Sequence, residues 1–173
     1  MPDFYGTVAA ADAYHAARAN TAWAGDDVAK QAALIRASAY IDGRYRKLMP
    51  SGVWQSLFPG VKTEGRGQAR EWPRTGATDY EGHALPGDEV PAEIEQATYE
   101  AALRELTEPG SLSPDYVAAT AIKREKVGPL ETEYAVASGA DGAASVRPVI
   151  SAIDELIAPV LVARYTLPAV MVV

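Results

Sequence analysis

The sequence predicts a mainly α-helical fold built around two helices that pack against each other. Apolar residues recur at helical spacing over about 27–48, and a second apolar face begins after Pro91 and runs to about 107. Proline suits the first turn of a helix, and Glu93 and Glu95 place negative charge near the positive end of the helix dipole. Alanines are frequent on both segments and would let the two helices approach closely. We therefore expect this pair to form the centre of the core.

Shorter helices are expected on either side of this pair. An extended lead-in at 5–8 precedes an alanine-rich helix over about 10–19. The long helix should begin at Asp26 or Asp27, because either side chain can cap it. Near the other end of the chain, Pro148 should open a short helix that runs to about Ala158.

A long loop is expected over 49–86, where glycine and proline interrupt the helical period. Its large apolar residues, Trp54 and Trp72 among them, argue against disorder, so we expect the loop to be ordered by packing. Pro73 disfavours the α conformation for Trp72, which predicts an extended arm with arginines at positions 70 and 74 on either side of the indole. Such an arm is expected to bind a partner.

Charge is unevenly distributed along the chain. Between Arg44 and Arg74 there are seven bases against two acids, whereas Asp79 to Glu108 holds nine acids and one base. The two segments could be separate solvated surfaces that never meet. Alternatively, the basic arm of one copy could lie on the acidic helix of the next, a heterologous contact that is able to close into a ring.

A β-hairpin is expected over about 121–136, because apolar or hydroxyl residues alternate with acids after Gly128-Pro129. Its basic first strand could face its acidic second strand, which favours a charge-paired surface over a nucleic-acid contact. The next segment, 137–147, has the composition of a flexible linker. The predicted organisation is a helical domain over 1–136 that carries the loop and the hairpin, the linker, and a C-terminal helix with an extended tail over 148–173.

The tail is apolar and rich in β-branched residues from Val160 to Val173, so it would promote aggregation if exposed. It could be a last strand folded back on the core. It could instead pair with an edge strand or groove of another subunit. In the second case, the contacts to that subunit would come from Arg164, Tyr165, Leu167, Val170 and Val172.

The composition argues against catalysis, metal binding and membrane insertion. The chain has 173 residues, 48% of them hydrophobic, a net charge of -7 and no cysteine, which excludes thiolate chemistry. His15 and His83 lack metal-ligand spacing, and no nucleophile or phosphate-loop motif is present. No apolar run is long enough to cross a bilayer, and no secretory signal opens the chain. We therefore expect neither an enzyme nor a protein with a metal or other cofactor.

The order of several short motifs resembles a known family. They are Tyr5-Gly6-Thr7-Val8, Tyr40-Ile41-Asp42, Trp72-Pro73-Arg74, Val90-Pro91 before an alanine-rich helix, Lys126-Val127-Gly128-Pro129-Leu130 and Ile153-Asp154-Glu155-Leu156. This arrangement spans nearly the whole chain and is similar to the head–tail adaptor, or connector, proteins of tailed bacteriophages. Some members of that family are labelled DnaT-like and single-stranded-DNA-binding.

The resemblance implies a structural protein of the virion neck, assembled in the bacterial host cytoplasm. Its copies would form a ring, commonly of twelve, beneath the portal protein and would join the portal to the next neck or tail protein, the stopper. DNA would pass through the channel without specific binding. In this interpretation Arg70, Trp72 and Arg74, together with the tail residues, form the subunit or portal interface.

The alternative is a DnaT-like single-stranded-DNA-binding protein. Aromatic residues and bases interleave between Arg44 and Tyr80, as in a groove that stacks bases and binds phosphates. Trp54, Trp72 and Tyr80 would stack the bases, and Lys62, Arg66 and the neighbouring arginines would bind the phosphates. Protein interfaces use the same residue types, so composition does not separate the two functions.

Overall fold

The computed structural model describes residues 3–114, 124–127, 130–133 and 148–162. Its helices are α1 (Val8–Ala17), α2 (Asp27–Arg44), α3 (Ala92–Thr107) and α5 (Ser151–Ile157). The strands are short and form two-stranded hairpins. The prediction of a mainly α fold with small β elements is confirmed. In this part of the chain, no helix is both long and apolar enough to span a bilayer.

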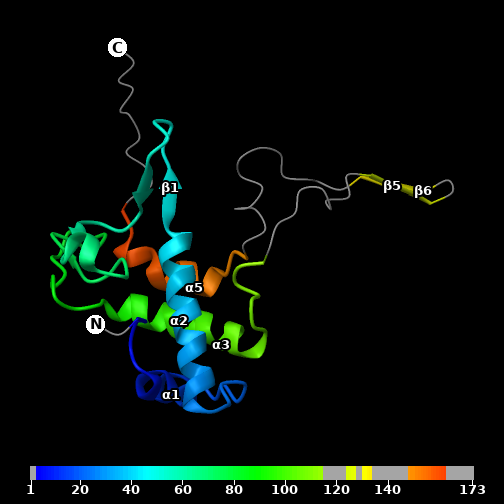
Figure 1. The fold of residues 1–173 in the computed structure, drawn as a ribbon, viewed down its shortest axis with the longest axis horizontal. Coiled ribbons are helices and arrows are strands. Elements are labelled where there is room, and N and C mark those ends of the chain that lie inside the picture. Colours follow the sequence, from blue (N-terminus) through cyan, green and yellow to red (C-terminus); the bar gives the residue numbers. More distant parts are fainter. Residues whose placement is uncertain (1–2, 115–123, 128–129, 134–147, 163–173) are drawn as a thin grey trace.

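The α2 helix crosses α3, and this pair forms the most extensive contact between elements (Figure 1). Leu34 and Ile41 of α2 and Ile94 of α3 are fully buried. Burying each such side chain contributes about 1.5–3 kcal/mol. Alanines on both helices are also fully buried, which permits the close approach. The predicted helix pair at the centre of the core is confirmed.

The C-terminal helix belongs to the same core. The α5 helix packs on α3, and Ile153 and Ile157 are buried there. Val160, in the short 3-10 helix η3 (Ala158–Val160), is also buried. The Tyr45 hydroxyl donates a hydrogen bond to Asp154 Oδ1 at 2.6 Å, which ties the end of α2 to α5.

Side-chain caps define where the first two helices begin. Thr7 Oγ1 accepts from the Ala10 N–H at 3.1 Å before α1, and Asp26 Oδ1 accepts from the Ala29 N–H at 2.8 Å before α2. Each bond satisfies a backbone donor that has no partner within the helix. Asp26 is therefore the cap of the long helix.

The predicted boundary of that helix at position 48 is wrong. The helix ends at Arg44, because the next residues form strand β1 (Arg46–Leu48), which pairs antiparallel with β2 (Trp54–Ser56). The predicted irregular loop also contains more regular structure than expected. It includes β3 (Val61–Lys62) paired with β4 (Arg74–Thr75), and a 3-10 turn, η1 (Gly65–Gly67).

The hairpin predicted over about 121–136 is confirmed, with shorter strands. Strand β5 (Arg124–Val127) pairs antiparallel with β6 (Leu130–Glu133). The register sets Arg124 opposite Glu133 and Lys126 opposite Glu131, so bases and acids occupy facing positions as expected. The predicted linker at 137–147 and the tail after Val162 lie outside the described residues.

Candidate nucleic-acid interface

Trp72 lies in the interior and not at the tip of an exposed arm. Its side chain is 0% exposed, and its indole packs edge-on against Phe58 with ring centroids 5.7 Å apart. Its backbone N–H donates to the Tyr5 hydroxyl at 3.1 Å. The expectation of an exposed indole is wrong, because the apolar ring gains more by burial than by exposure and the chain supplies the polar partner its backbone needs. In this conformation a partner cannot reach the ring.

The two neighbouring arginines are also used inside the chain. The Arg74 guanidinium donates to the carbonyl oxygens of Pro59 at 2.6 Å and Gly60 at 2.7 Å, and to Glu71 Oε2 at 2.9 Å. Arg70 forms ion pairs with Asp42 at 3.7 Å and Asp3 at 3.4 Å. The Arg74 contacts join distant parts of the loop, whereas the Arg70 contacts tie the loop to α2 and to the N-terminal segment.

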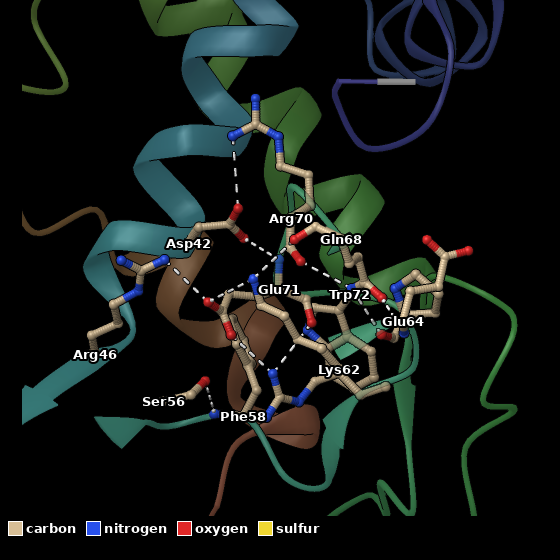
Figure 2. Close-up of polar contacts among 12 residues, drawn as sticks. Asp42, Arg46, Ser56, Phe58, Lys62, Glu64, Gln68, Arg70, Glu71 and Trp72 are labelled. Atoms are coloured by element: carbon tan, nitrogen blue, oxygen red, sulfur yellow. Dashed lines mark hydrogen bonds and ion pairs between the residues drawn. The ribbon is translucent and has the colours of Figure 1, made fainter. Parts of the chain in front are cut away.

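Glu71 is the central counter-ion of this loop (Figure 2). Its buried carboxylate pairs with Arg74 at 2.9 Å, Arg46 at 3.1 Å and Lys62 at 3.6 Å. The contact to Arg46 ties the base of strand β1 to the buried segment. Through this contact the buried segment anchors the first strand of the β1–β2 hairpin.

Asp42 is the second buried carboxylate, placed in the last turn of α2. It accepts from the Tyr5 hydroxyl at 2.5 Å and from the Glu71 N–H at 3.4 Å. Burial raises the pKa of the Asp42 carboxyl, and the bond from Tyr5 and the charge of Arg70 oppose that rise. Burial, together with the Asp42 charge, also raises the pKa of the Tyr5 hydroxyl. Tyr5 therefore remains a neutral donor.

The basic segment offers few free charges as a result. Five of its seven bases form ion pairs within the chain, and none of their partners lies on α3; the five are Arg44, Arg46, Lys62, Arg70 and Arg74. Lys47 and Arg66 are exposed and have no ion-pair partner among the described residues. Both earlier interpretations of the charge division assumed exposed bases. The structure neutralises most of them internally.

The exposed feature of this region is the β1–β2 hairpin, which projects from the helical body (Figure 1). Its turn is closed by the Met49 N–H, which donates to the Val53 carbonyl at 2.9 Å, and by Gly52, whose φ of 79° suits a three-residue hairpin loop. The register sets Leu48 opposite Trp54 and Arg46 opposite Ser56. Alternation of side chains then puts all four on one face of the hairpin.

Apolar side chains are unusually exposed on this hairpin. Trp54 is 65% exposed, Val53 62% and Leu48 46%. An exposed apolar cluster on a soluble domain marks a binding surface more often than a structural one. An exposed indole beside cations can stack on a nucleic-acid base or fill a pocket of a protein partner.

The remaining predicted contacts are dispersed. Lys62 is partly buried, where it pairs with Glu71 and donates to the Gln68 carbonyl at 3.3 Å. Arg66 is exposed on η1, away from the hairpin strands in sequence. Trp54 is thus the predicted nucleic-acid contact whose ring the hairpin presents to solvent. The predicted interface residues Arg164, Tyr165, Leu167, Val170 and Val172 lie outside the described residues.

A possible metal-ligand set that the sequence analysis did not anticipate occurs in the turn after β4. One ligand atom from each of Asp79, Glu81 and His83 lies within 4.8 Å of the others. Asp79 Oδ1 already accepts from the Glu81 N–H at 2.9 Å and the His83 N–H at 2.8 Å. The backbone bond from His83, followed by its ring, lowers the pKa of Asp79. Turn formation therefore accounts for the cluster.

Residues 2–172 match the family described as "Putative DnaT-like ssDNA binding protein". The chain belongs to this family. No curated protein and no solved structure matches it. In this DnaT-like family member, Trp72 is a core residue and Trp54 is the aromatic residue on the projecting hairpin. The match covers almost the whole chain, including the helical core and the hairpin.

Proposed function

We propose that this DnaT-like protein binds single-stranded DNA, with the β1–β2 hairpin as the contact surface. The observation that carries the proposal is the 65% exposure of Trp54 on a hairpin that the Arg46–Glu71 contact anchors to the core. A base stacked on an aromatic side chain contributes about 1–3 kcal/mol. The family description points to the same class of ligand.

The phosphate contribution is expected to be small. Lys47 is exposed, and the Arg46 side chain keeps 44% exposure while it pairs with Glu71. A net charge of -7 repels phosphates from the rest of the surface. Two phosphate contacts would give a slope of about -1.4 for log K against log salt on a single strand. Binding would therefore depend mainly on stacking and only weakly on salt.

The direct test is fluorescence anisotropy with a labelled single-stranded oligonucleotide. Trp54→Ala should weaken binding at least about fivefold, because one stacking contact is lost. Tyr80→Ala is the matched control: Tyr80 is 70% exposed but lies outside the hairpin, so its loss should leave the affinity unchanged. Equal affinity of the wild type and Trp54→Ala, or no binding at micromolar protein, would refute the proposal.

A head–tail adaptor is the second candidate. The observation that favours it is that Leu48 and Val53 expose apolar surface next to Trp54 while most nearby bases are neutralised. A tryptophan with apolar neighbours and little free charge suits the core of a protein interface. Under this proposal, copies form a ring under a portal protein and join it to a downstream neck protein, in the neck of a virion.

Electron microscopy of the protein mixed with a portal protein tests this candidate. Rings attached to the portal that disappear with Trp54→Ala would support it, because the same hairpin would then be the docking element. An unattached monomer that binds the oligonucleotide would exclude it and retain the first proposal.

A further inference from the structure

The two bases of the β1–β2 hairpin lie on opposite faces. Directly paired side chains share a face of the hairpin, and successive residues of a strand alternate between the faces. The register therefore puts Arg46 on the face of Trp54, and it puts Lys47, which lies opposite Gln55, on the reverse face. Arg46 is thus the base that accompanies the exposed indole.

The pairing with Glu71 leaves an excess of positive charge at Arg46 (Figure 2). The single carboxylate of Glu71 lies within ion-pair distance of three cations, Arg74, Arg46 and Lys62. One negative charge cannot cancel three positive charges. Of the three cations, Arg46 has the most exposed side chain. The hairpin therefore presents the uncompensated charge to solvent beside Trp54.

The guanidinium of Arg46 also has donors to spare. Its Nη2 donates to Glu71 Oε1 at 3.1 Å, and no second acceptor contacts the side chain among the described residues. A guanidinium has five N–H donors in one plane, and two of them can bind a phosphate side by side. Because Glu71 already orients the group, less side-chain freedom is lost when an anion binds.

Arg46 and Trp54 are diagonal neighbours in the ladder. Leu48 lies directly opposite Trp54, and Arg46 precedes Leu48 by two residues on the same strand. Diagonal neighbours lie about 7–8 Å apart, within reach of aromatic and long side chains. A base stacked on Trp54 and a phosphate next to that base can therefore contact the two side chains at the same time.

We propose that Trp54 and Arg46 together bind one nucleotide unit of a single strand, with the base stacked on the indole and the adjacent phosphate on the guanidinium. This inference rests on the proposed function and adds the phosphate-binding residue to it. Glu71 acts as the positioning residue, because it touches Arg46 and not the nucleotide. The unit must offer both an unstacked base and a charged phosphate, which a single strand does and an intact duplex does not.

The salt dependence of oligonucleotide binding, measured by fluorescence anisotropy, tests this assignment. Each phosphate contact to a single strand contributes about 0.7 to the slope of log K against log salt, so Arg46→Gln should flatten the slope by about 0.7. Arg36→Gln is the matched control and should leave the slope unchanged. Arg36 also pairs with a buried carboxylate, that of Glu105, and is exposed to a similar extent, but it lies on α2 outside the hairpin. A slope that flattened in Lys47→Gln and not in Arg46→Gln would overturn the inference.

An oligonucleotide with methylphosphonate linkages, which carry no charge, separates loss of a phosphate contact from damage to the hairpin. The wild type and Arg46→Gln should bind this probe with equal affinity, because the charge that Arg46 pairs with is absent. A defect of Arg46→Gln that persisted on this probe would show that Arg46 only holds the hairpin in place, and would overturn the inference. Failure of the wild type to bind any oligonucleotide would refute the proposed function itself. Binding that is lost in Trp54→Ala but keeps its salt slope in Arg46→Gln would refute this inference alone.

Discussion

The Tyr5 hydroxyl donates to Asp42 Oδ1 at 2.5 Å and joins the N-terminal segment to the end of α2. The same hydroxyl accepts from the Trp72 N–H at 3.1 Å, so one side chain connects three distant parts of the sequence. Tyr5 is 2% exposed, so both bonds are made in the interior. These two bonds fix the backbone at position 72 inside the fold, and not on an exposed arm.

Tyr5→Phe should therefore destabilise the fold by about 1–3 kcal/mol, since it leaves the buried Trp72 N–H unpaired and removes one donor to Asp42. Urea unfolding followed by circular dichroism measures the change. Tyr14→Phe is the control, because its hydroxyl donates to Glu100 at 3.1 Å from a partly buried position. Its cost should stay below about 1 kcal/mol. Equal costs for both variants would contradict the role given to Tyr5.

Glu71→Gln should cost about 3–5 kcal/mol, because it removes the counter-ion of three cations, of which Arg74 is 5% exposed. The substitution keeps the side chain's size, so the loss reports charge and not packing. Glu100→Gln is the control, since Glu100 pairs with Arg104 in an i,i+4 contact on α3 in which the arginine side chain keeps 37% exposure. Such a pair contributes about 0.3–0.5 kcal/mol. If the urea midpoint of Glu71→Gln equalled that of the wild type, the ion pairs of Glu71 would contribute no net stability.

Stability should fall as pH drops below about 6.5, the ordinary pKa of histidine. His15 is 1% exposed; its Nε2 lies 3.2 Å from the Tyr99 carbonyl and its Nδ1 lies 3.1 Å from Asn20 Nδ2. Burial lowers the His15 pKa, so the unfolded chain binds a proton more readily than the folded one in this range. Acid therefore favours unfolding.

Urea unfolding at pH 5.5 and 7.5 measures this effect, and His15→Gln should reduce the difference between the two values. His83→Gln is the control, because His83 is exposed in its turn. The Asp12 and Glu100 carboxylates favour protonation of His15 and Arg18 disfavours it, so they set how far the effect extends. An unchanged pH difference in His15→Gln would assign the acid sensitivity to other groups.

Gly6→Ala should destabilise more than Gly52→Ala, although both glycines have positive φ, 73° and 79°. A Cβ at Gly6 would lie 2.0 Å from the Tyr99 hydroxyl oxygen, whereas nothing lies within 4 Å of one at Gly52. Backbone strain alone costs about 1–2 kcal/mol, and overpacking at Gly6 adds about 1–3 kcal/mol. Thermal unfolding of the two variants compares them. Equal shifts would mean that Tyr99 moves aside freely.

The helices are predictable because their signals are local, but α1 begins at Val8 and not near position 10, and α5 begins at Ser151 and not at Pro148. Asp26 caps α2 by accepting a hydrogen bond from the N–H of a residue three positions away. The apolar residues of α2 and of α3 recur at helical spacing within each segment. The β5–β6 hairpin follows from alternation within a few residues. The end of α2 was misplaced because Arg46–Leu48 pair with Trp54–Ser56, and strand pairing overrides a helical pattern that continues only weakly.

The candidate site was only partly predictable. Exposed aromatic and basic residues were expected between Arg44 and Tyr80, but which indole faces solvent depends on packing. Ser38 and Asp42 lie four residues apart, on the side of α2 that the apolar residues share, and this spacing is the sequence signal for polar groups that need hydrogen-bond partners in the core. In the structure both side chains are almost fully buried. Tyr5, which bonds to both, is more than 30 positions away from either.

By itself, then, the sequence determined a helical core, its caps, a hairpin and an excess of charge in two segments. The tertiary structure alone decided that Trp72 is buried, that Glu71 and Asp42 neutralise the basic segment, and that Trp54 stands on an exposed hairpin. The physical reason is the distance along the chain over which each interaction acts. Helical spacing and capping act over a few residues, whereas burial and ion pairing are settled by contacts between segments that meet only when the chain has folded.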